Sequence, residues 1–438
     1  MLYFLIIFSK FVSFFIRIFR FGSGSTWPGH LVLFFDPKFV KKVIEKNPNL
    51  KIFVVTGTNG KTTTVALLKH LLEKNNISCF SNQEGANLLN GIASALVKNI
   101  NIKGKIKKEV ALFEVDEFNF PLVLKEFNPV GIIILNLFRD QLDRYGEVNN
   151  IFSRWLEALK NVSSNTVVFL NGDDPQLYYL GKKILCRVFY FGLRKELMPL
   201  KKIPHDVDFN YCPVCFKILS YKKIAYSHLG KFICKNCGFK QSDIFTLDRF
   251  VSNFLLKGVC NFYNLTAVFV FLEKIFGFSS KKIELMITDF LPVFGRQEKI
   301  NYNKRDFYIF LSKNPTGFNQ SIDAALSLIK NKKNIFWFIL NNKIPDGHDV
   351  SWIWDVDFNR IFLANKKIFV SGDRVFDMAI RLKYENSPLK KKIIPIRDLK
   401  LTLKEILKAT RENEKIFVFP NYSAMLEVRK LLVGRKFL

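Results

Sequence analysis

One segment of the sequence has residue types and spacing that suit phosphate chemistry: Thr56–Thr64, TGTNGKTTT. In a loop that joins a strand to a helix, backbone N–H groups and the positive end of the helix dipole converge on one point, which suits a phosphate. Lys61 can neutralise phosphate charge, and Thr62 can place a hydroxyl on Mg²⁺. The strict pattern GxxxxGK(S/T) is not met, because its first glycine would fall on Val55. The alternative interpretation is a glycine turn before an ordinary helix.

Four further residues have the spacing of a metal site: Cys212, Cys215, Cys234 and Cys237. They form two CxxC pairs, and four thiolates in this arrangement can surround one Zn²⁺ tetrahedrally with no open position. We therefore predict a structural zinc ribbon, the alternative being four unrelated core cysteines. His205 and His228 fall outside the pairs, and we expect both at the surface.

Acidic side chains follow the predicted strands at the points where each strand ends. Glu114 ends one strand, Asp140 follows the next, and Asp173 and Asp174 follow a third. A carboxylate at a strand end near a phosphate loop commonly holds Mg²⁺. We predict that role for Glu114. For Asp173 and Asp174 we favour the alternative, a helix N-cap or turn.

The elements that must position these residues follow a strand–helix rhythm. Four apolar runs predict buried parallel strands: Ile52–Val55, Val110–Val115, Val130–Leu135 and Thr166–Leu170. Helical stretches lie between them. Four more strands alternate with helices near the C-terminus: Ile335–Leu340, Lys367–Ser371, Lys392–Ile396 and Ile416–Phe419. The pattern is α/β and mostly parallel, and such sheets bind ligands at the carboxyl ends of their strands.

Composition limits the class of protein. A chain of 438 residues should hold two or three domains, and 49% hydrophobic content excludes general disorder. The formal net charge of +29 indicates an anionic partner (nucleic acid, an acidic membrane surface or a phosphorylated substrate) or a compositional drift toward scattered lysines. Seven cysteines do not suggest a disulfide scaffold in a chain of this length and fit a reducing cytoplasm.

The first 21 residues are apolar but are interrupted by Lys10, Arg17 and Arg20. The longest uncharged run is nine residues, too short to span a bilayer. Phe8, Phe11 and neighbouring apolar residues can form one face of an amphipathic helix. That helix can lie on a membrane or pack on the protein, and the sequence leaves both interpretations open.

Two polar loops follow strands of the C-terminal unit: Leu311–Gln320 and Asn341–Asp357. The second contains Trp352 and Trp354. Tryptophans beside a turn at a strand end suit a binding surface. They can equally fill the core of the domain.

Six motifs occur in the order found in the Mur ligase family: TGTNGKTTT, FEVDE, NLFRDQLDRYGE, LNGDDP, GVCNFYNLTAV and FGRQE. The chain resembles that family from about Lys51 to the C-terminus. Mur ligases make an acyl phosphate from a carboxylate and ATP, and an amine then displaces the phosphate. Many carry His where this sequence has Gln141, which puts a second metal site in doubt. The resemblance implies an ATP site made of Gly57, Thr58, Asn59, Gly60, Lys61, Thr62 and Thr63, with Asn261 and Asn264 near the adenine and Arg296 between the central and C-terminal domains.

The cysteine insert narrows the resemblance to the MurT family, the ligase subunits of lipid II isoglutaminyl synthase. This implies a central P-loop ATPase domain over residues 51–297, with a zinc-ribbon insert at about 205–240. An apolar segment and linker (1–50) would precede it, and a Rossmann-like α/β domain (298–438) would follow. The implied reaction belongs to peptidoglycan biosynthesis: amidation of the α-carboxylate of D-glutamate in lipid II to D-isoglutamine. It would take place in the cytoplasm, at or near the inner face of the membrane.

The resemblance also implies a partner, a GatD-like glutamine amidotransferase subunit. In MurT proteins an aspartate completes a triad with the cysteine and histidine of GatD, and Asp349 is the matching position; Asp346 is the alternate. The residues support a missing partner, because a glutaminase needs an activated thiol with a histidine base. None of the chain's five histidines has a nucleophile-elbow context. Ammonia must therefore arrive free or from another subunit.

Two alternative functions remain at this point. A peptide-adding Mur or folylpolyglutamate-type ligase would share the phosphate loop, but should lack the cysteine insert and the loop around Asp349. A zinc-ribbon NTPase stimulated by nucleic acid would explain the basic charge and the cysteines. It would leave the ordered Asn, Arg and Asp segments unexplained, and we expect no nucleic-acid partner.

Overall fold

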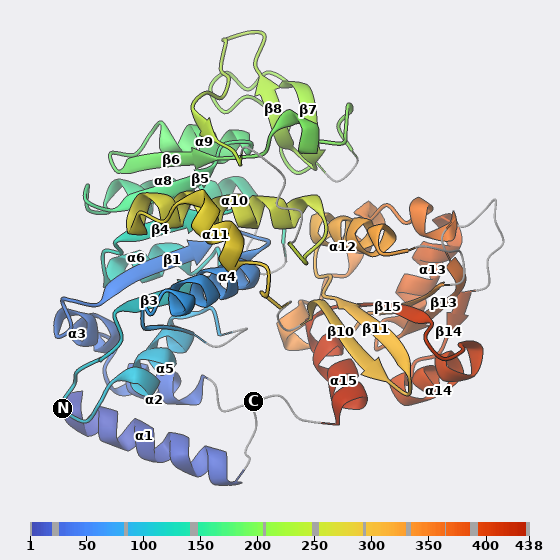
Figure 1. Ribbon diagram of the computed structural model, residues 1–438, viewed down its shortest axis with the longest axis horizontal. Helices are drawn as coiled ribbons and strands as arrows, with labels where there is room; N and C mark the ends of the chain where they lie inside the picture. Colours follow the sequence, from blue (N-terminus) through green and yellow to red (C-terminus); the bar gives the residue numbers. More distant parts are fainter. Residues whose placement is uncertain are drawn as a thin grey trace.

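The computed structural model describes residues 2–19, 26–82, 86–140, 148–204, 207–247, 254–291, 295–329, 334–363, 365–385 and 393–434. Two α/β sheets with their helices lie side by side, the N-terminal one on the left of Figure 1 and the C-terminal one on the right. A small two-stranded hairpin projects from the N-terminal part at the top of the view. The site described below lies where these parts meet.

The N-terminal sheet has seven strands in the order β2-β3-β1-β4-β5-β6-β9, and every neighbouring pair is parallel. The four strands predicted in this region are confirmed, with ends that differ by one residue. The strands are β1 (Lys51–Thr56), β2 (Cys79–Ser81), β3 (Val110–Glu114), β4 (Gly131–Ile134), β5 (Val167–Asn171), β6 (Arg187–Phe191) and β9 (Ile244–Phe245).

Helices cover both faces of this sheet. The core on one face includes residues of α5 (Leu89–Asn99), α6 (Phe120–Glu126), α8 (Val148–Lys160) and α9 (Pro175–Gly181). The core on the other face is formed with α4 (Lys61–Lys74), α10 (Val259–Phe276) and α11 (Ser280–Met286). Among the described residues, α10 is the one helix long and apolar enough to cross a membrane by length and composition, and most of it is buried in this core.

Three N-terminal helices pack onto the first of these cores: α1 (Leu2–Phe19), α2 (Trp27–Phe35) and α3 (Phe39–Glu45). The sequence indicated an apolar segment and a linker over residues 1–50, and the structure places all three helices there. Pro28 lies in the first turn of α2, where its fixed φ is compatible with a helix. Gly29 lets α2 approach α5 closely, because a Cβ there would lie 1.8 Å from the carbonyl oxygen of Asn90.

The projecting hairpin consists of β7 (Ser220–Tyr226) and β8 (Leu229–Ile233), which pair antiparallel. A short 3-10 helix, η1 (Lys195–Leu197), precedes it. The hairpin packs against both cores of the sheet, because Phe232 belongs to one and Leu229 to the other. The two cysteine pairs flank this hairpin in the sequence, and the hairpin projects from the N-terminal part (Figure 1).

The C-terminal sheet has six strands in the order β10-β11-β15-β12-β13-β14, with β10 and β11 antiparallel and the rest parallel. The four strands predicted here are confirmed. A strand was also expected before Leu311, and β11 lies there; β10 was not predicted. The strands are β10 (Arg296–Tyr302), β11 (Arg305–Phe310), β12 (Asn334–Ile339), β13 (Asn365–Ser371), β14 (Ile393–Pro395) and β15 (Lys415–Pro420).

Helices again cover both faces of the second sheet. One core includes residues of α12 (Pro315–Ser327), α13 (Val375–Glu385), η3 (Ser351–Asp355) and η4 (Asn359–Leu363). The other includes residues of α14 (Leu399–Ala409) and α15 (Tyr422–Val433). A short 3-10 helix, η2 (Ile344–Asp346), contacts α15.

Candidate functional site

The phosphate loop has the predicted geometry: β1 ends at Thr56, α4 begins at Lys61, and the loop lies between them. Gly60 adopts a φ of 93°, a left-handed conformation that glycine reaches without strain. A side chain could not replace its hydrogen, because a Cβ at Gly60 would lie 2.2 Å from Oδ1 of Asn264 on α10. Backbone conformation and close packing therefore both require glycine here.

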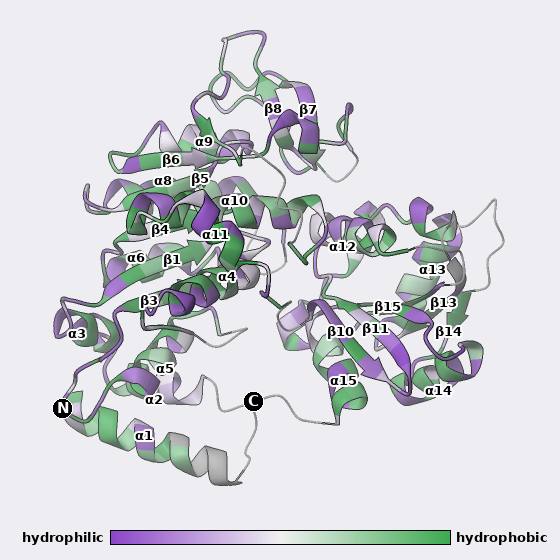
Figure 2. Cartoon of the chain, in the orientation of Figure 1, coloured by the Kyte–Doolittle hydropathy of each residue, from purple (hydrophilic) through white to green (hydrophobic). Residues whose placement is uncertain are grey.

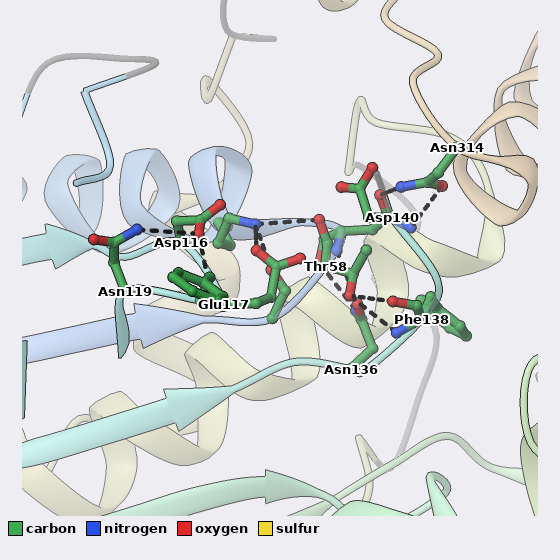
Figure 3. A network of polar contacts seen from close by, with 12 residues as sticks. Thr58, Asp116, Glu117, Asn119, Asn136, Phe138, Asp140 and Asn314 are labelled. Carbon is green, nitrogen blue, oxygen red and sulfur yellow. Dashed lines mark hydrogen bonds and ion pairs between the residues drawn. The ribbon is translucent and has the colours of Figure 1, made fainter. Parts of the chain in front are cut away.

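The segment after β4 holds the loop in place. Thr58 Oγ1 accepts a hydrogen bond from the backbone N–H of Phe138 at 2.9 Å and donates one to its carbonyl oxygen at 3.1 Å. The Asn136 side chain accepts from the Asn59 N–H at 2.8 Å and donates to the Asn59 carbonyl at 2.9 Å. These paired contacts fix the path of the loop (Figure 3).

Lys61 is buried and its ammonium group has three acceptors. Nζ donates to the carbonyl oxygens of Gly57 at 2.5 Å and Thr58 at 3.2 Å, and to Oε2 of Glu117 at 2.9 Å. Burial alone would raise the pKa of Glu117, but the positive charges of Lys61 and Lys313 hold it below its ordinary value. Glu117 is therefore a buried carboxylate anion, and it faces the phosphate loop (Figure 3).

The C-terminal loop Leu311–Gln320 contacts this site from the opposite side. Lys313 Nζ lies 2.5 Å from Oδ2 of Asp140, whose side chain is almost wholly buried. Burial would lower the pKa of Lys313, but the charges of Asp140 and Glu117 raise it above its ordinary value. Two lysines and two carboxylates therefore form one charge network across the two parts of the chain.

A pair of amides closes the same junction. The Asn314 and Asn59 side chains exchange hydrogen bonds of 3.1 and 3.3 Å. Asn314 also caps the N-terminus of α12, because its Oδ1 accepts from the N–H of Gly317 at 2.7 Å. The first turn of α12 is thus anchored to the phosphate loop, as Figure 3 shows for Asn314.

A pocket lies between the phosphate loop, α10 and the C-terminal loop. Six of the residues predicted to bind ATP line it: Asn59, Gly60, Thr63, Asn261, Asn264 and Arg296. Lys313 and Gln320 line it from the C-terminal side. The other four predicted residues are Gly57, Thr58, Lys61 and Thr62, which belong to the loop and the first turn of α4 beside the pocket.

The two asparagines predicted near the adenine are neighbours on α10. Asn264 Nδ2 lies 3.3 Å from Oδ1 of Asn261, and Asn261 Nδ2 donates to the carbonyl oxygen of Lys257 at 2.8 Å. Gln297 exchanges two hydrogen bonds with the backbone of the same Lys257, at 2.5 and 2.8 Å. Strand β10, which begins the C-terminal sheet, is therefore hydrogen-bonded to the segment just before α10, the helix that carries Asn261 and Asn264.

Glu114 is buried at the carboxyl end of β3, beside Val55 of β1 in the sheet register. Alternation along β3 puts Glu114 on the same face as Leu112, which packs in the core beneath α4. The Asn82 side chain holds its backbone with two hydrogen bonds of 2.8 Å. Thr62 lies in the first turn of α4, the helix that covers this face of the sheet.

The oxygen ligands in this region fit Mg²⁺. Asp140 Oδ1 is buried and accepts no hydrogen bond from the described residues. Burial and the nearby Glu117 charge raise the pKa of Asp140, whereas the Lys313 charge opposes that rise. Carboxylate and hydroxyl oxygens are the ligands that Mg²⁺ prefers. Gln141, at which the sequence left a second metal site in doubt, lies outside the described residues.

Glu117 and Lys313 are functional candidates that sequence reasoning did not single out. Both lie inside motifs that it used, Glu117 as the last residue of FEVDE and Lys313 in LSKNPTG. Glu117 lies beyond the end of β3, so its direction could not be derived from the strand. Lys313 reaches the site only through the packing of the two sheets.

Arg139 connects three parts of the chain. Its guanidinium lies 2.5 Å from Asp355 of η3 and 3.5 Å from Asp208 of the segment before the hairpin. Its backbone N–H also donates to Asp208 at 2.9 Å. Arg139 immediately precedes Asp140, so the same short segment contacts Lys313 and the loop that contains Asp349.

The prediction that His228 lies at the surface is wrong. Its side chain is fully buried, its ring lies 5.0 Å from that of Phe138, and Nε2 lies 3.5 Å from Oδ2 of Asp174. The turn between β7 and β8 carries it back onto the sheet. Asp174 caps α9, as favoured from sequence, and Asp173 accepts from Lys231 of β8 at 2.7 Å. His205 lies outside the described residues.

The two aspartates of the loop Asn341–Asp357 have different environments. Asp346 is held by α15, because it accepts hydrogen bonds from the backbone N–H and the hydroxyl of Ser423, and burial raises its pKa. Asp349 is exposed, and the bonds that it accepts from the described residues are local, from the N–H and hydroxyl of Ser351 at 2.8 and 2.9 Å. Of the two, Asp349 is the carboxylate that a second molecule can reach.

The two tryptophans of this loop divide between the alternatives left open by the sequence. Trp352 packs against Phe318 of α12, with ring centroids 6.1 Å apart. Trp354 is half exposed and lies against Tyr384 of α13. Trp352 is therefore a core residue, and Trp354 belongs to the surface.

The cysteine cluster fits a tetrahedral metal site. The four Sγ atoms of Cys212, Cys215, Cys234 and Cys237 all lie within 4.8 Å of one another. Two Sγ–Sγ distances are 3.5 Å, close to the value of about 3.8 Å that zinc–thiolate bonds of roughly 2.3 Å require in a tetrahedron. Each pair forms the same turn, closed by a backbone hydrogen bond to the first cysteine from Phe216 in one and Gly238 in the other.

We expect the purified chain to contain about one Zn²⁺, and Cys212→Ser to remove it. Loss of the metal should destabilise the β7–β8 hairpin, which then becomes sensitive to proteolysis. Metal analysis and limited proteolysis measure both effects, with Val214→Ser, an exposed position between the first two cysteines, as the matched control. Full zinc content in Cys212→Ser would contradict the assignment.

Comparisons with known proteins agree with this geometry. The Mur ligase middle domain model matches residues 55–271, and the MurT ligase C-terminal model matches residues 311–425. The chain is 33% identical to the lipid II isoglutaminyl synthase (glutamine-hydrolyzing) subunit MurT of Streptococcus pneumoniae, over 95% of this chain and 94% of that protein. The chain belongs to the MurT family of Mur ligases. It is therefore a carbon–nitrogen ligase.

A second MurT relative and two solved structures agree with this assignment. The MurT subunit of Staphylococcus aureus is 31% identical over 92% of this chain and 91% of its own length. Among solved structures, a pseudomurein peptide ligase type C from Methanothermus fervidus matches with a TM-score of 0.62 and 22% identity, covering 90% of this chain and 81% of the other. MurF of Thermotoga maritima in complex with ADP matches with a TM-score of 0.60 and 17% identity, with the same coverage. These structures establish the Mur ligase fold.

Proposed function

We propose that this chain is the ATP-dependent subunit that amidates the α-carboxylate of D-glutamate in lipid II, giving D-isoglutamine for peptidoglycan synthesis. The observation that carries the proposal is the junction of the two sheets, where Lys61 of the phosphate loop and Lys313 of the C-terminal loop share one charge network. Two cations at a phosphate loop suit transfer of a phosphoryl group between two bound molecules. The relatives' names supply the substrate class.

In the proposed first step, a carboxylate oxygen of the substrate attacks the γ-phosphorus of ATP, and the bond to the β,γ-bridging oxygen breaks. The products are an acyl phosphate and ADP. The backbone N–H groups of Gly57–Gly60 and the Lys61 ammonium would hold the phosphates, and Asn261 and Asn264 would hold the adenine. Lys313, which lines the pocket opposite the loop, would stabilise charge on the transferred phosphoryl group.

Thr62 and Glu114 would hold Mg²⁺, with Asp140 and Glu117 close by, and the ion would neutralise charge on the phosphate oxygens. Glu117 positions Lys61 through the 2.9 Å contact. The four cysteines would hold a structural Zn²⁺.

In the second step, ammonia attacks the acyl carbon, and inorganic phosphate leaves. We propose that the ammonia comes from a GatD-type glutaminase bound at the loop Asn341–Asp357. The exposed carboxylate of Asp349 is suited to orient a histidine of that partner and to stabilise its positive charge. Residues 51–297 would form the ATP-binding domain, with the insert at about 205–240, and residues 298–438 the domain that meets the partner.

Lys313 allows a test of the ligase half alone. Lys313→Met should leave Asp140 as an unpaired buried carboxylate and destabilise the chain by about 3–5 kcal/mol. Adding Asp140→Asn removes that charge and should recover much of the stability. Thermal unfolding of the single and double variants measures this effect.

Turnover should not recover with stability in the double variant. The variant folds, but it still lacks the Lys313 cation that would stabilise the transferred phosphoryl group. We expect the double variant to stay at least about 100-fold below wild type in ADP release driven by ammonium. The single variant Asp140→Asn is the control, because it shows how much of the lost turnover is caused by removing the carboxylate. Wild-type turnover in the stable double variant would show that Lys313 has only a structural role.

A further inference from the structure

An aromatic surface covers the solvent side of α1 and α2. Its exposed members lie along one stripe of each helix, and we call them the aromatic surface: Phe4, Ile7, Phe8, Phe11, Phe14, Trp27, Phe34 and Phe35. Figure 2 shows α1 as mainly hydrophobic along the lower edge of the molecule. With roughly 150–250 Å² per aromatic side chain and about half of each exposed, the surface presents on the order of 700 Å². Monomeric proteins rarely expose so large an apolar patch.

The two helices contribute to one continuous surface. Phe8 of α1 contacts Phe4 on one side and Phe35 of α2 on the other, with ring centroids 6.0 and 6.5 Å apart. Phe35 in turn contacts Phe34, the most exposed of the set. The opposite side of α1 is already used, because Leu5 and Ile6 are buried in the core. The surface is therefore held rigidly, facing outward.

Charge around the surface has one predominant sign. No acidic residue occurs in residues 2–35, and the first one, Asp36, is buried and paired with Lys42 at 2.7 Å. At the N-terminal end of α1, Lys46 donates to the Tyr3 hydroxyl at 3.1 Å and lies 4.3 Å from its ring centroid. Lys105, from a loop with further exposed lysines, donates to the Lys46 carbonyl at 3.0 Å. Glu45 and Glu109 are exposed acids in these flanking segments.

We propose that the aromatic surface docks onto a membrane containing anionic lipid. Phenylalanine and tryptophan side chains would enter the boundary between head groups and acyl chains, while Tyr3, Lys46 and Lys105 would lie at head-group depth. Because the other side of α1 is packed on the protein, the helix would lie in the plane of the membrane without crossing it. A net charge of +29 favours an anionic surface over a neutral one.

A second copy of this chain is the main competing occupant. Two identical surfaces would bring the Lys46 and Lys105 regions of both copies to the same interface. The charge pattern therefore favours lipid over self-association. The inference does not depend on the reaction proposed above, since it rests on α1, α2 and their flanking lysines alone.

Vesicle flotation of the full chain tests the proposal. We expect the chain to float with vesicles of phosphatidylglycerol and phosphatidylcholine, and several-fold less with phosphatidylcholine alone. Phe11→Ser combined with Phe34→Ser should lower flotation about tenfold or more. The matched control is Leu185→Ser with Leu285→Ser, two exposed leucines outside α1 and α2. Equal flotation of both double variants would overturn the proposal.

Two further measurements separate lipid insertion from other causes. Brominated lipid should quench tryptophan fluorescence of the wild-type chain, and Trp27→Phe should remove that quenching. Lys103→Glu with Lys105→Glu should reduce binding to anionic vesicles more than Lys400→Glu with Lys404→Glu, which changes net charge equally on α14. Wild-type flotation confined to dimers, with Phe11→Ser and Phe34→Ser producing monomers, would assign the surface to a second copy instead.

Discussion

Replacing Asp349 with asparagine is expected to lower glutamine-driven amidation by about 10⁴-fold while amidation with ammonium continues. The amide cannot stabilise a histidine cation or fix its tautomer as a carboxylate does. The substitution should not disturb the fold, because asparagine keeps the oxygen that accepts from the Ser351 N–H at 2.8 Å. Product analysis with each nitrogen source, on the chain co-purified with its glutaminase, measures the ratio.

Two other variants give this experiment its controls. Asp346→Asn tests the alternate aspartate; we expect it to weaken the attachment of η2 to α15 and to lower stability, with both nitrogen sources affected alike. Glu412→Gln removes an exposed acid of the same domain that pairs with Lys304, and should change neither activity. Glutamine-driven turnover that survives in Asp349→Asn but is lost selectively in Asp346→Asn would reverse the assignment.

Lys61→Ala should abolish product formation with glutamine and with ammonium alike, by at least about 10²–10³-fold. The lysine would contact the phosphates that both routes need, so the nitrogen source cannot compensate. The single variant also leaves Glu117 buried without its partner, which costs about 3–5 kcal/mol. Lys61→Ala with Glu117→Gln removes that charge and should restore folding without restoring turnover.

The measurements for Lys61 are nucleotide binding and ADP release on the folded double variant. Glu117→Gln alone should bind nucleotide more strongly than the double variant, because it keeps the lysine. If the double variant made amidated product at the wild-type rate, Lys61 would not be part of the reaction. The Lys61 variants therefore test the step that both nitrogen sources need. The Asp349 variant tests the step that only glutamine needs.

Much of the scaffold could be predicted, because buried parallel strands are continuous apolar runs. The phosphate loop was recognisable from its glycines and from Lys61. Strand β10, and with it the β10–β11 hairpin, was missed because the turn between the two strands lacks the usual residue pair. Asn303 and Lys304 both have positive φ, at 47° and 58°, and such a turn normally carries Asn-Gly. Here the second position is Lys304, and an Asn-Lys pair does not predict a hairpin turn.

The composition of the site could be predicted only in part. Several acids follow the strands, and the sequence could not show that Glu117 is the one that contacts Lys61. The role predicted for Glu114, a Mg²⁺ ligand, is a separate one and stays a prediction. Lys313 joins Asp140 across 173 positions of the chain, a contact that exists only after the two sheets pack. His228 was misplaced because ligand spacing does not reveal that its turn folds back against Phe138. All three contacts depend on the packing of segments that are far apart in the sequence, which is why the sequence did not predict them.

The central claim is that this chain joins ammonia from a partner's glutamine to lipid II at the expense of ATP. The most direct measurement is mass spectrometry of lipid II after incubation with the co-purified pair, ATP and glutamine labelled with ¹⁵N in its amide. The account predicts an amidated product that carries ¹⁵N at the α-amide of D-glutamate, with ADP released in equal amount. Unamidated lipid II, although the folded pair hydrolyses glutamine and binds ATP, would contradict the account.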